Sequence, residues 1–289
     1  MSRSRRDLLV LLAALTPAAR GARGLVVCTN ANACGRVGHG FGHSALSCLQ
    51  VLAGSDLEVV SGPCLTMCSK GVNARVVDDD GERGTLLFGI NSYARCAEVH
   101  ETLSGSELPN GLVARFEAAV EAQRELDEAP PGPRPASYPD LLGSLRDGIA
   151  LGRELVAGEP RAPPAPRGGS WQEGPWTGGK LPQHDVGSPR AVWLAGLLVS
   201  YANAQLVDGR ADDAASAAKE ACEHCPALPS ALEARANAEL EVGREAAARE
   251  ALEDLFWLEP HTAPWIDQQT SNSRRQLSFK LKKLRNRAT

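Results

Sequence analysis

The chain has 289 residues, which is enough for two domains that each bury a hydrophobic core. Its formal net charge of −4 excludes a generally basic nucleic-acid-binding protein. The eight cysteines are spread over a chain with enough apolar residues to fold without cross-links, which argues against a small secreted disulfide scaffold and favours a reducing compartment.

Residues 1–24 are predicted to be a targeting segment. They contain five arginines and one acidic residue around a mostly apolar stretch from Leu8 to Ala19. That stretch is too short for a stable membrane anchor, so no transmembrane span is predicted. The basic start and apolar middle are typical of a secretory signal, whereas the arginine richness and near lack of acids are typical of an organelle transit peptide.

Residues 25–104 are predicted to form a small α/β domain. Hydrophobic runs and turn residues predict four strands and two helices. The strands are expected at 25–28, 57–61, 73–77 and 85–88, and the helices at 43–53 and 91–104.

Four cysteines follow two of these strands. Cys28 and Cys34 form a C-x5-C pair in VVCTNANACGRVG, and Cys64 and Cys68 form a C-x3-C pair in SGPCLTMCSKG. Loops at strand ends can bring two sequence-distant pairs to one edge of a small sheet. Four convergent thiolates suit a soft metal ion or an iron–sulfur cluster.

This arrangement resembles the thioredoxin-like [2Fe-2S] ferredoxins, whose relatives include the small cluster-bearing subunit of respiratory NADH dehydrogenase. The resemblance covers residues 24–104 and rests on V-C-T-N after a strand, on the Gly-rich loop and helix, and on G-x-C-x3-C-x2-G. It implies a thioredoxin-like fold and a [2Fe-2S] cluster bound by Cys28, Cys34, Cys64 and Cys68. It also implies one-electron transfer to a redox protein partner.

Two alternatives stay open for the same thiols. A structural zinc ion also accepts four thiolates, but its common sites use C-x2-C to C-x4-C spacing. A redox disulfide favours C-x2-C at a helix N-terminus, and none of these four cysteines has that spacing.

The other four cysteines are interpreted as structural thiols. Cys48 lies in ALSCLQVL and Cys96 in SYARCAEV, both predicted to be helical, and both are expected to be small buried apolar side chains. Cys222 and Cys225 form a C-x2-C pair in KEACEHCPAL. For this pair we expect one buried and one near-surface thiol rather than a metal site.

Residues 105–158 are predicted to be connecting helices, and residues 159–189 a linker. Apolar side chains recur at helical spacing in 108–128 and again in 138–157. The stretch from Glu159 to Arg190 contains seven prolines and six glycines, a composition typical of linkers.

Residues 190–289 are predicted to be an all-α domain of tetratricopeptide-like repeats, because six residue types recur after 34 positions. The aligned pairs are Ala204 with Ala238, Leu206 with Leu240, Gly209 with Gly243, Arg210 with Arg244, Ala214 with Ala248, and Pro226 with Pro260. The glycines are expected at the turn inside each helix pair, and the prolines at the end of each second helix. Two repeats are too few to bury a continuous core, so the 138–157 helix or the C-terminal segment is expected to pack on them.

The C-terminus is predicted to be a basic helix. Residues 270–289 contain seven Lys or Arg and no acid, whereas residues 204–259 contain thirteen acids and five bases. Pairing with the acidic repeats, contact with nucleic acid and a solvated helical face are the three interpretations of this segment. Because the whole chain is acidic, no nucleic-acid partner is predicted.

The chain is interpreted as an iron–sulfur electron carrier, or as the electron-transfer subunit of a larger redox complex, whose repeats bind a protein or peptide. No Ser-His-Asp arrangement, paired-carboxylate motif or nucleotide fingerprint is recognised, so no catalytic residue is predicted. The alternative is a tetratricopeptide scaffold or assembly factor with a structural or metal-free N-terminal domain. Because iron–sulfur centres are assembled in organelles, the targeting segment favours the chloroplast, with the mitochondrion as the alternative.

Overall fold

The computed structural model describes residues 24–29, 41–54, 57–62, 65, 72–77, 83–129, 134–162 and 187–262. The chain divides into two compact units, Met1–Glu117 and Ala118–Thr289. The first is an α/β unit and the second is all helical. Most of the predicted targeting segment, most of the predicted linker and the predicted basic C-terminal helix lie outside the described residues.

The α/β unit contains four strands and two helices in the described part, in the predicted order. They are β1 (Gly24–Cys28), α2 (Phe41–Ala53), β2 (Glu58–Gly62), β3 (Ala74–Val77), β4 (Arg83–Leu87) and α3 (Tyr93–Ser104). The strand order in the sheet is β2-β1-β3-β4. β1 pairs in parallel with β2 and antiparallel with β3, and β3 pairs antiparallel with β4. All six elements lie within a few residues of their predicted positions, so these predictions are confirmed.

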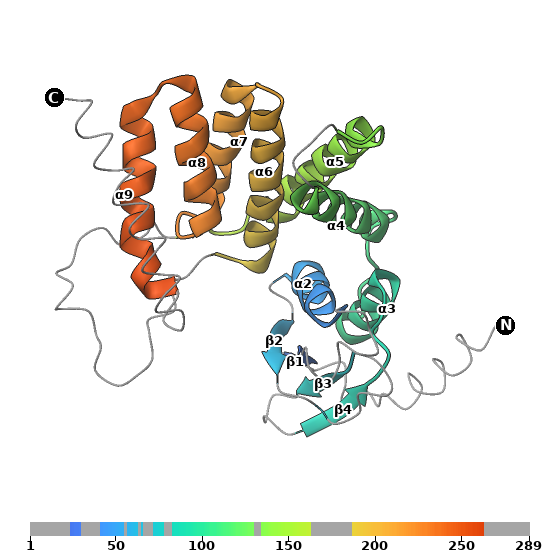
Figure 1. Cartoon of the computed structure of the whole chain (residues 1–289). Helices are drawn as coiled ribbons and strands as arrows, with labels where there is room; N and C mark the ends of the chain where they lie inside the picture. The colour runs from blue at the N-terminus through green and yellow to red at the C-terminus, as the bar shows by residue number, and fades with distance from the viewer. Residues whose placement is uncertain are drawn as a thin grey trace, which may run out of the picture. The chain divides into compact units, whose positions relative to one another are not determined.

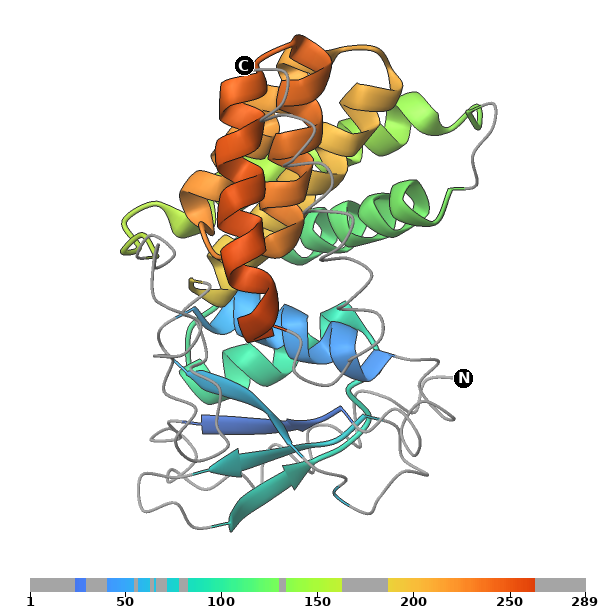
Figure 2. The same ribbon diagram turned by 60° about the vertical axis from the view of Figure 1, so that its left-hand side comes forward.

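One face of the sheet carries the core of this unit. Side chains alternate between the two faces of a strand, and Leu25, Val27, Val59 and Val76 are buried while Val60 is 39% exposed. Figures 1 and 2 show α2 and α3 on the same face of the sheet. The alternating apolar residues of the strands therefore pack under these two helices.

The ends of α3 are fixed by local hydrogen bonds. Ser92 is its N-cap, and the Ser92 hydroxyl accepts a hydrogen bond from the Arg95 N–H over 3.2 Å. Gly105 ends the helix in the left-handed conformation, with φ of 70°. α4 (Leu112–Glu128) follows, and the division between the two units falls within it.

The helical unit contains the second part of α4 and five further helices in the described residues. They are α5 (Tyr138–Val156), α6 (Pro189–Val207), α7 (Ala211–His224), α8 (Pro229–Val242) and α9 (Glu245–Thr262). Each helix from α5 to α9 packs on the next one in sequence. Figure 1 shows α6, α7, α8 and α9 side by side. Of the two segments expected to pack on these helices, the 138–157 helix does so, through α6. The C-terminal segment lies outside the described residues.

Small residues allow these helices to approach closely. An added Cβ at Gly152 of α5 would lie 2.9 Å from Leu194 Cδ1 of α6, so a larger residue does not fit there without movement. The alanines at the faces between α6, α7 and α8 are fully or nearly fully buried; they include Ala202, Ala214, Ala218, Ala231 and Ala236. Short side chains thus form much of the contact between these helices, in a chain with only 4% aromatic residues.

The 34-residue period is visible in the hydrogen bonds of the turns. The Arg210 N–H donates to the Gln205 carbonyl over 2.9 Å, and 34 residues later the Arg244 N–H donates to the Glu239 carbonyl over 2.8 Å. The glycine before each arginine has a positive φ, 71° at Gly209 and 85° at Gly243. Both glycines thus lie in the turns where they were expected.

The two prolines of the repeat behave differently. Pro226 follows the end of α7 directly, as predicted. The prediction that Pro260 ends the second helix of the next pair is wrong, because α9 continues to Thr262. A proline lacks the N–H that would bond four residues back, but the residues after it can keep helical dihedral angles. A proline near the last turn therefore does not have to end the helix.

Candidate functional site

Cys28 is the one predicted cluster ligand that the structure describes. It is the last residue of β1 and is fully buried. Cys34, Cys64 and Cys68 lie outside the described residues. The described residues next to these three cysteines in the sequence nevertheless lie close to Cys28.

The end of β1 lies beside the end of β2. In this parallel pair Cys28 is in register with Gly62, so both strands point their carboxyl ends to the same edge of the sheet. Neighbouring strands are about 4.8 Å apart. Cys64 follows Gly62 by two residues in the sequence, so the segment that carries it starts from the strand beside Cys28.

The second cysteine segment also returns beside Cys28. The Cys28 N–H donates to the Asn73 carbonyl over 2.9 Å, on the side of β1 that faces β3. Val72 is held in turn by Asn91, whose side-chain oxygen accepts from the Val72 N–H over 3.1 Å. The strands that precede and follow residues 63–71 in the sequence, β2 and β3, are thus the two neighbours of β1 in the sheet.

Packing and a cross-strand hydrogen bond fix this edge of the sheet. The hydroxyls of Thr29 and Ser61 lie 2.6 Å apart and share a hydrogen bond between the two segments. An added Cβ at Gly62 would lie 2.1 Å from Val26 Cγ1, so only glycine fits there without movement. These contacts hold the starting points of both cysteine segments together.

The described residues do not complete a metal site. No three metal-binding side chains come together within the part of the chain that the structure describes. That part contains one of the four predicted ligands, so the cluster stays a prediction. The neighbouring strand ends are the feature of the described part that favours it.

Cys48 and Cys96 are buried in the α/β unit, as predicted. Both thiols are fully inaccessible to solvent. The Cys96 Sγ lies 4.0 Å from the Ala45 carbonyl oxygen of α2. A hydrogen bond with Cys96 and burial together raise the pKa of the Cys48 thiol far above its ordinary value. The Cys48 side chain therefore stays protonated at neutral pH in the folded unit.

Cys222 and Cys225 are both buried, so the prediction of one near-surface thiol is wrong. Burial raises the pKa of Cys222 to about 12. Cys225 lies just past the end of α7, where the chain before α6 covers it: an added Cβ at Gly187 would lie 3.4 Å from the Cys225 Sγ. The sequence pattern of α7 could not reveal this, because the covering residue is far away in the chain.

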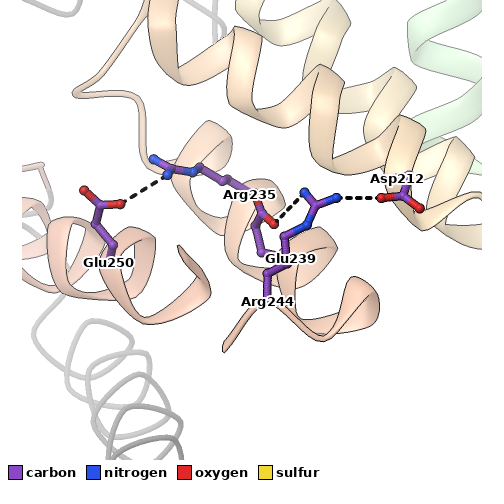
Figure 3. Close-up of polar contacts among 5 residues, drawn as sticks. All are labelled: Asp212, Arg235, Glu239, Arg244 and Glu250. Carbon is purple, nitrogen blue, oxygen red and sulfur yellow. Dashed lines mark hydrogen bonds and ion pairs between the residues drawn. The ribbon is translucent and has the colours of Figure 1, made fainter. Parts of the chain in front are cut away.

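Two groups of ion pairs join α7, α8 and α9 of the helical unit, and Figure 3 shows them. Arg244, in the turn after α8, donates to Asp212 at the start of α7 over 2.6 Å and to Glu239 over 3.2 Å. Glu239 is buried, so this pairing compensates a carboxylate that has little access to water. Arg235 donates to Glu250 of α9 over 3.3 Å.

The sequence reasoning missed these ion pairs. The 34-residue spacing makes Arg210 and Arg244 equivalent but does not give their partners. The signal was present, because Glu239 precedes Arg244 by five residues and both flank the glycine turn. In the first repeat Gln205 takes the place of Glu239, and Arg210 pairs with Asp213 instead, over 2.5 Å.

A second charged contact ties α5 to α7. The Arg153 guanidinium donates two hydrogen bonds to the Glu220 carboxylate, each of 2.7 Å. His224 lies 3.9 Å from the same carboxylate. The Arg153 hydrogen bond, followed by that of His224, lowers the pKa of Glu220 to about 2.

A shallow groove lies on the helical unit between α6 and α8. Its volume is about 430 Å³, and it is lined by Leu206, Val207, Asn237, Leu240 and Glu241. Val207 is 76% exposed, the highest value given for a large apolar side chain in the described residues. The groove offers apolar surface with one carboxylate at its side. None of the described helices is both long enough and apolar enough to cross a membrane.

Comparison with known proteins gives no match. No family model matches the chain, and neither a curated protein nor a solved structure is significantly similar to it. Function must therefore be argued from the residues and the geometry described above.

Proposed function

We propose that the α/β unit binds a [2Fe-2S] cluster and carries single electrons to a protein partner, and that the helical unit binds a protein. The observation that carries the proposal is the register of Cys28 with Gly62. Because of this register, the two strands that precede the predicted ligand pairs end at the same edge of the sheet. A site built from two sequence-distant pairs requires such an arrangement.

The order and pairing of the strands support the proposal. The resemblance in the sequence implies a compact α/β unit with both cysteine segments at strand ends. The observed unit has that order of elements, and residues 63–71 join strands on either side of β1. We therefore propose a thioredoxin-like fold for this unit.

Cys28, Cys34, Cys64 and Cys68 would hold the cluster, which would supply a one-electron couple. The buried position of Cys28 suits this role, because low solvent access around a ligand helps set the reduction potential. The Cys28 backbone N–H is already used by Asn73. This N–H would therefore not be the donor that moderates the charge on the cluster sulfurs.

The helical unit supplies the surface for a protein partner. Its turns repeat every 34 residues, as in tetratricopeptide arrays, and the groove at Leu206, Val207 and Leu240 exposes apolar side chains. Exposed apolar surface bordered by polar residues is typical of protein-binding sites. We propose that a peptide or a protein edge with apolar side chains contacts this groove.

The first experiment tests the cluster. The full-length protein is purified without oxygen, reconstituted with iron and sulfide, and analysed by visible absorption and by electron paramagnetic resonance after reduction. We expect about two irons and two sulfides per chain and a signal from one unpaired electron. Cys64→Ser should bleach the centre, whereas the control Cys222→Ser, at a buried thiol of the helical unit, should keep it.

A colourless protein without iron and sulfide after reconstitution would refute the cluster. One zinc ion per chain in the same sample would instead identify the four thiols as a structural zinc site.

A second candidate function is that of a scaffold or assembly factor. It is favoured by the division into two compact units, since the helical unit has its own core and its own exposed groove. Partner binding that survives replacement of all four cysteines by serine would support it. Recovery of the chain in one stable large complex would instead identify an electron-transfer subunit of that complex.

A further inference from the structure

Two thiols outside the proposed cluster site lie together in the core of the α/β unit. Cys48 belongs to α2 and Cys96 to α3, the two helices that pack on each other. Both side chains are fully buried. They are thus neighbours across a helix interface although they are far apart in the sequence.

The contact of Cys96 with α2 shows how close the thiols are. The Cys96 Sγ lies 4.0 Å from the Ala45 carbonyl oxygen. In an α-helix a carbonyl group lies beside the residues three and four positions later, and Cys48 is three positions after Ala45. Consistent with this position, Cys96 is the neighbour that contributes most to raising the pKa of the Cys48 thiol.

The residues around this contact let the helices approach closely. Ala45 and Ala97 are buried beside the two cysteines, and neither has a side chain longer than one carbon. A disulfide needs Cα atoms about 4.4–6.8 Å apart, which helices reach only where small residues face each other. Because both thiols lie at this contact between the helices, changes of side-chain rotamer move the two sulfurs relative to each other without a shift of the backbone.

We propose that Cys48 and Cys96 form a reversible disulfide that links α2 to α3. With a low-molecular-weight disulfide as the oxidant, one protein thiolate attacks the oxidant and releases one small thiol. The second protein thiol, after loss of its proton, then attacks the mixed disulfide and releases the other small thiol. Two protein thiols and one small disulfide thus become one protein disulfide and two small thiols, and two electrons pass to the oxidant.

Burial makes this reaction slow until the helices separate locally. A fully buried thiol with a raised pKa is a poor nucleophile in the closed unit. Local opening of α2 or α3 exposes it and allows exchange. The bond closes a loop that contains β2, β3 and β4, so it should stabilise the folded α/β unit against unfolding.

The test maps the bond in the full-length protein. Reduced protein is incubated without denaturant in an excess of oxidised over reduced glutathione, and the remaining thiols are blocked with N-ethylmaleimide. Cleavage after Lys and Arg and before Asp gives a peptide of residues 37–55, with Cys48 as its only cysteine. The same digestion gives a peptide of residues 96–115, with Cys96 as its only cysteine.

We expect the two peptides joined, two hydrogens lighter than their sum, and separated again by dithiothreitol. Oxidation should raise the thermal midpoint of the wild type. Cys48→Ser and Cys96→Ser should each abolish both effects, while the control Cys222→Ser keeps them. As a second pair of variants that avoids an unpaired buried hydroxyl, Cys48→Ala and Cys96→Ala should behave like the serine variants.

Two results would overturn the proposal. One is that both peptides carry only N-ethylmaleimide or glutathione after long oxidation, also when dilute urea promotes opening. The other is that either thiol is found joined mainly to Cys28, Cys34, Cys64 or Cys68. Neither result bears on the cluster, which is measured separately by its iron and its spectrum.

Discussion

Gln205 is a polar side chain in an apolar place. It lies in α6 and is fully buried, and neither its amide nitrogen nor its amide oxygen has a hydrogen-bond partner in the described part of the chain. An amide that is buried without a partner loses the hydrogen bonds that it makes with water in the unfolded chain, and this loss destabilises the fold. This residue therefore weakens the core of the helical unit.

Replacing Gln205 with leucine should stabilise the protein. Leucine has a similar size and no polar atom to desolvate, so we expect the free energy of unfolding to rise by about 1–2 kcal/mol. Urea unfolding at neutral pH measures this. The control is Gln123→Leu, which should destabilise the protein because Gln123 donates a hydrogen bond of 3.2 Å to the Ser200 hydroxyl. If both variants lost the same free energy of unfolding, the explanation would be contradicted.

Single residues show where sequence reasoning works and where it stops. The burial of Cys48 and Cys96 was predictable, because apolar neighbours at helical spacing surround both. The burial of Cys225 was not, because the chain near Gly187 covers it from a distance of nearly forty residues. The unpaired amide of Gln205 was also not predictable. Its equivalent 34 residues later, Glu239, has a hydrogen bond from Arg244, whereas the Gln205 amide has no partner in the described residues.

At the scale of elements, Gly148 and Gly143 of α5 differ in how closely other helices approach them. An added Cβ at Gly148 would lie 2.3 Å from the Cβ of Ala119 and 3.2 Å from the Cδ1 of Leu197. At Gly143 of the same helix an added Cβ would meet no atom within 4 Å. The helix thus offers one glycine that packing requires and one that it does not.

The two glycine positions should respond in opposite directions to alanine. Gly148→Ala should lower the free energy of unfolding by about 1–3 kcal/mol, because the new methyl overlaps Ala119. Gly143→Ala should raise it by about 0.5–1 kcal/mol, because alanine restricts the unfolded chain and favours the helix. Thermal and urea unfolding of both variants measure the effects. Stabilisation by both would mean that α4 and α5 are not packed as described.

The contact between α5 and α7 should depend on pH. The pKa of Glu220 is lowered from its ordinary 4.5 to about 2 by Arg153 and His224. A lowered pKa in the folded state means that the contact stabilises the fold above the ordinary pKa. That contribution is then lost as the pH falls from about 4.5 towards 2.

Arg153→Met should remove part of this acid sensitivity. Arg153 is half-exposed, so the contribution at neutral pH is expected to be at most about 1 kcal/mol. The stability difference between wild type and variant should therefore shrink between about pH 6 and pH 3 in urea titrations. Arg146→Met is the control, because Arg146 donates to the neutral Tyr201 hydroxyl, and its difference from the wild type should stay constant. A constant difference for Arg153→Met would refute the role of this pair.

For the whole molecule, local patterns were sufficient for the elements and for the coarse division into an α/β part and an all-helical part. Apolar periodicity and turn residues predicted the six elements described in the first unit and the helices α4 and α5, while the 34-residue spacing predicted helix pairs with turns at Gly209 and Gly243. They gave the end of α9 incorrectly, because one proline was assumed to stop a helix.

What the local patterns could not give is how distant segments meet. The register that brings Cys28 beside Gly62 depends on strand pairing across more than thirty residues. The ion pairs of Arg244 and Arg153 likewise join helices whose relative positions are set by packing. The thiol pair of α2 and α3 belongs to the same class, because each cysteine alone gives no sign of its partner.

The equivalence of the turns at Gly209 and Gly243 makes the helical unit modular. The two turns lie 34 positions apart and have the same backbone hydrogen bonds. The helices that follow them, α7 and α9, therefore begin with the same backbone geometry. If a second copy of residues 211–244 were inserted after Arg244, the turn at Gly243 would precede it and a copy of the same turn would follow it. Evolution or design can therefore lengthen the array by whole modules without inventing a new connection.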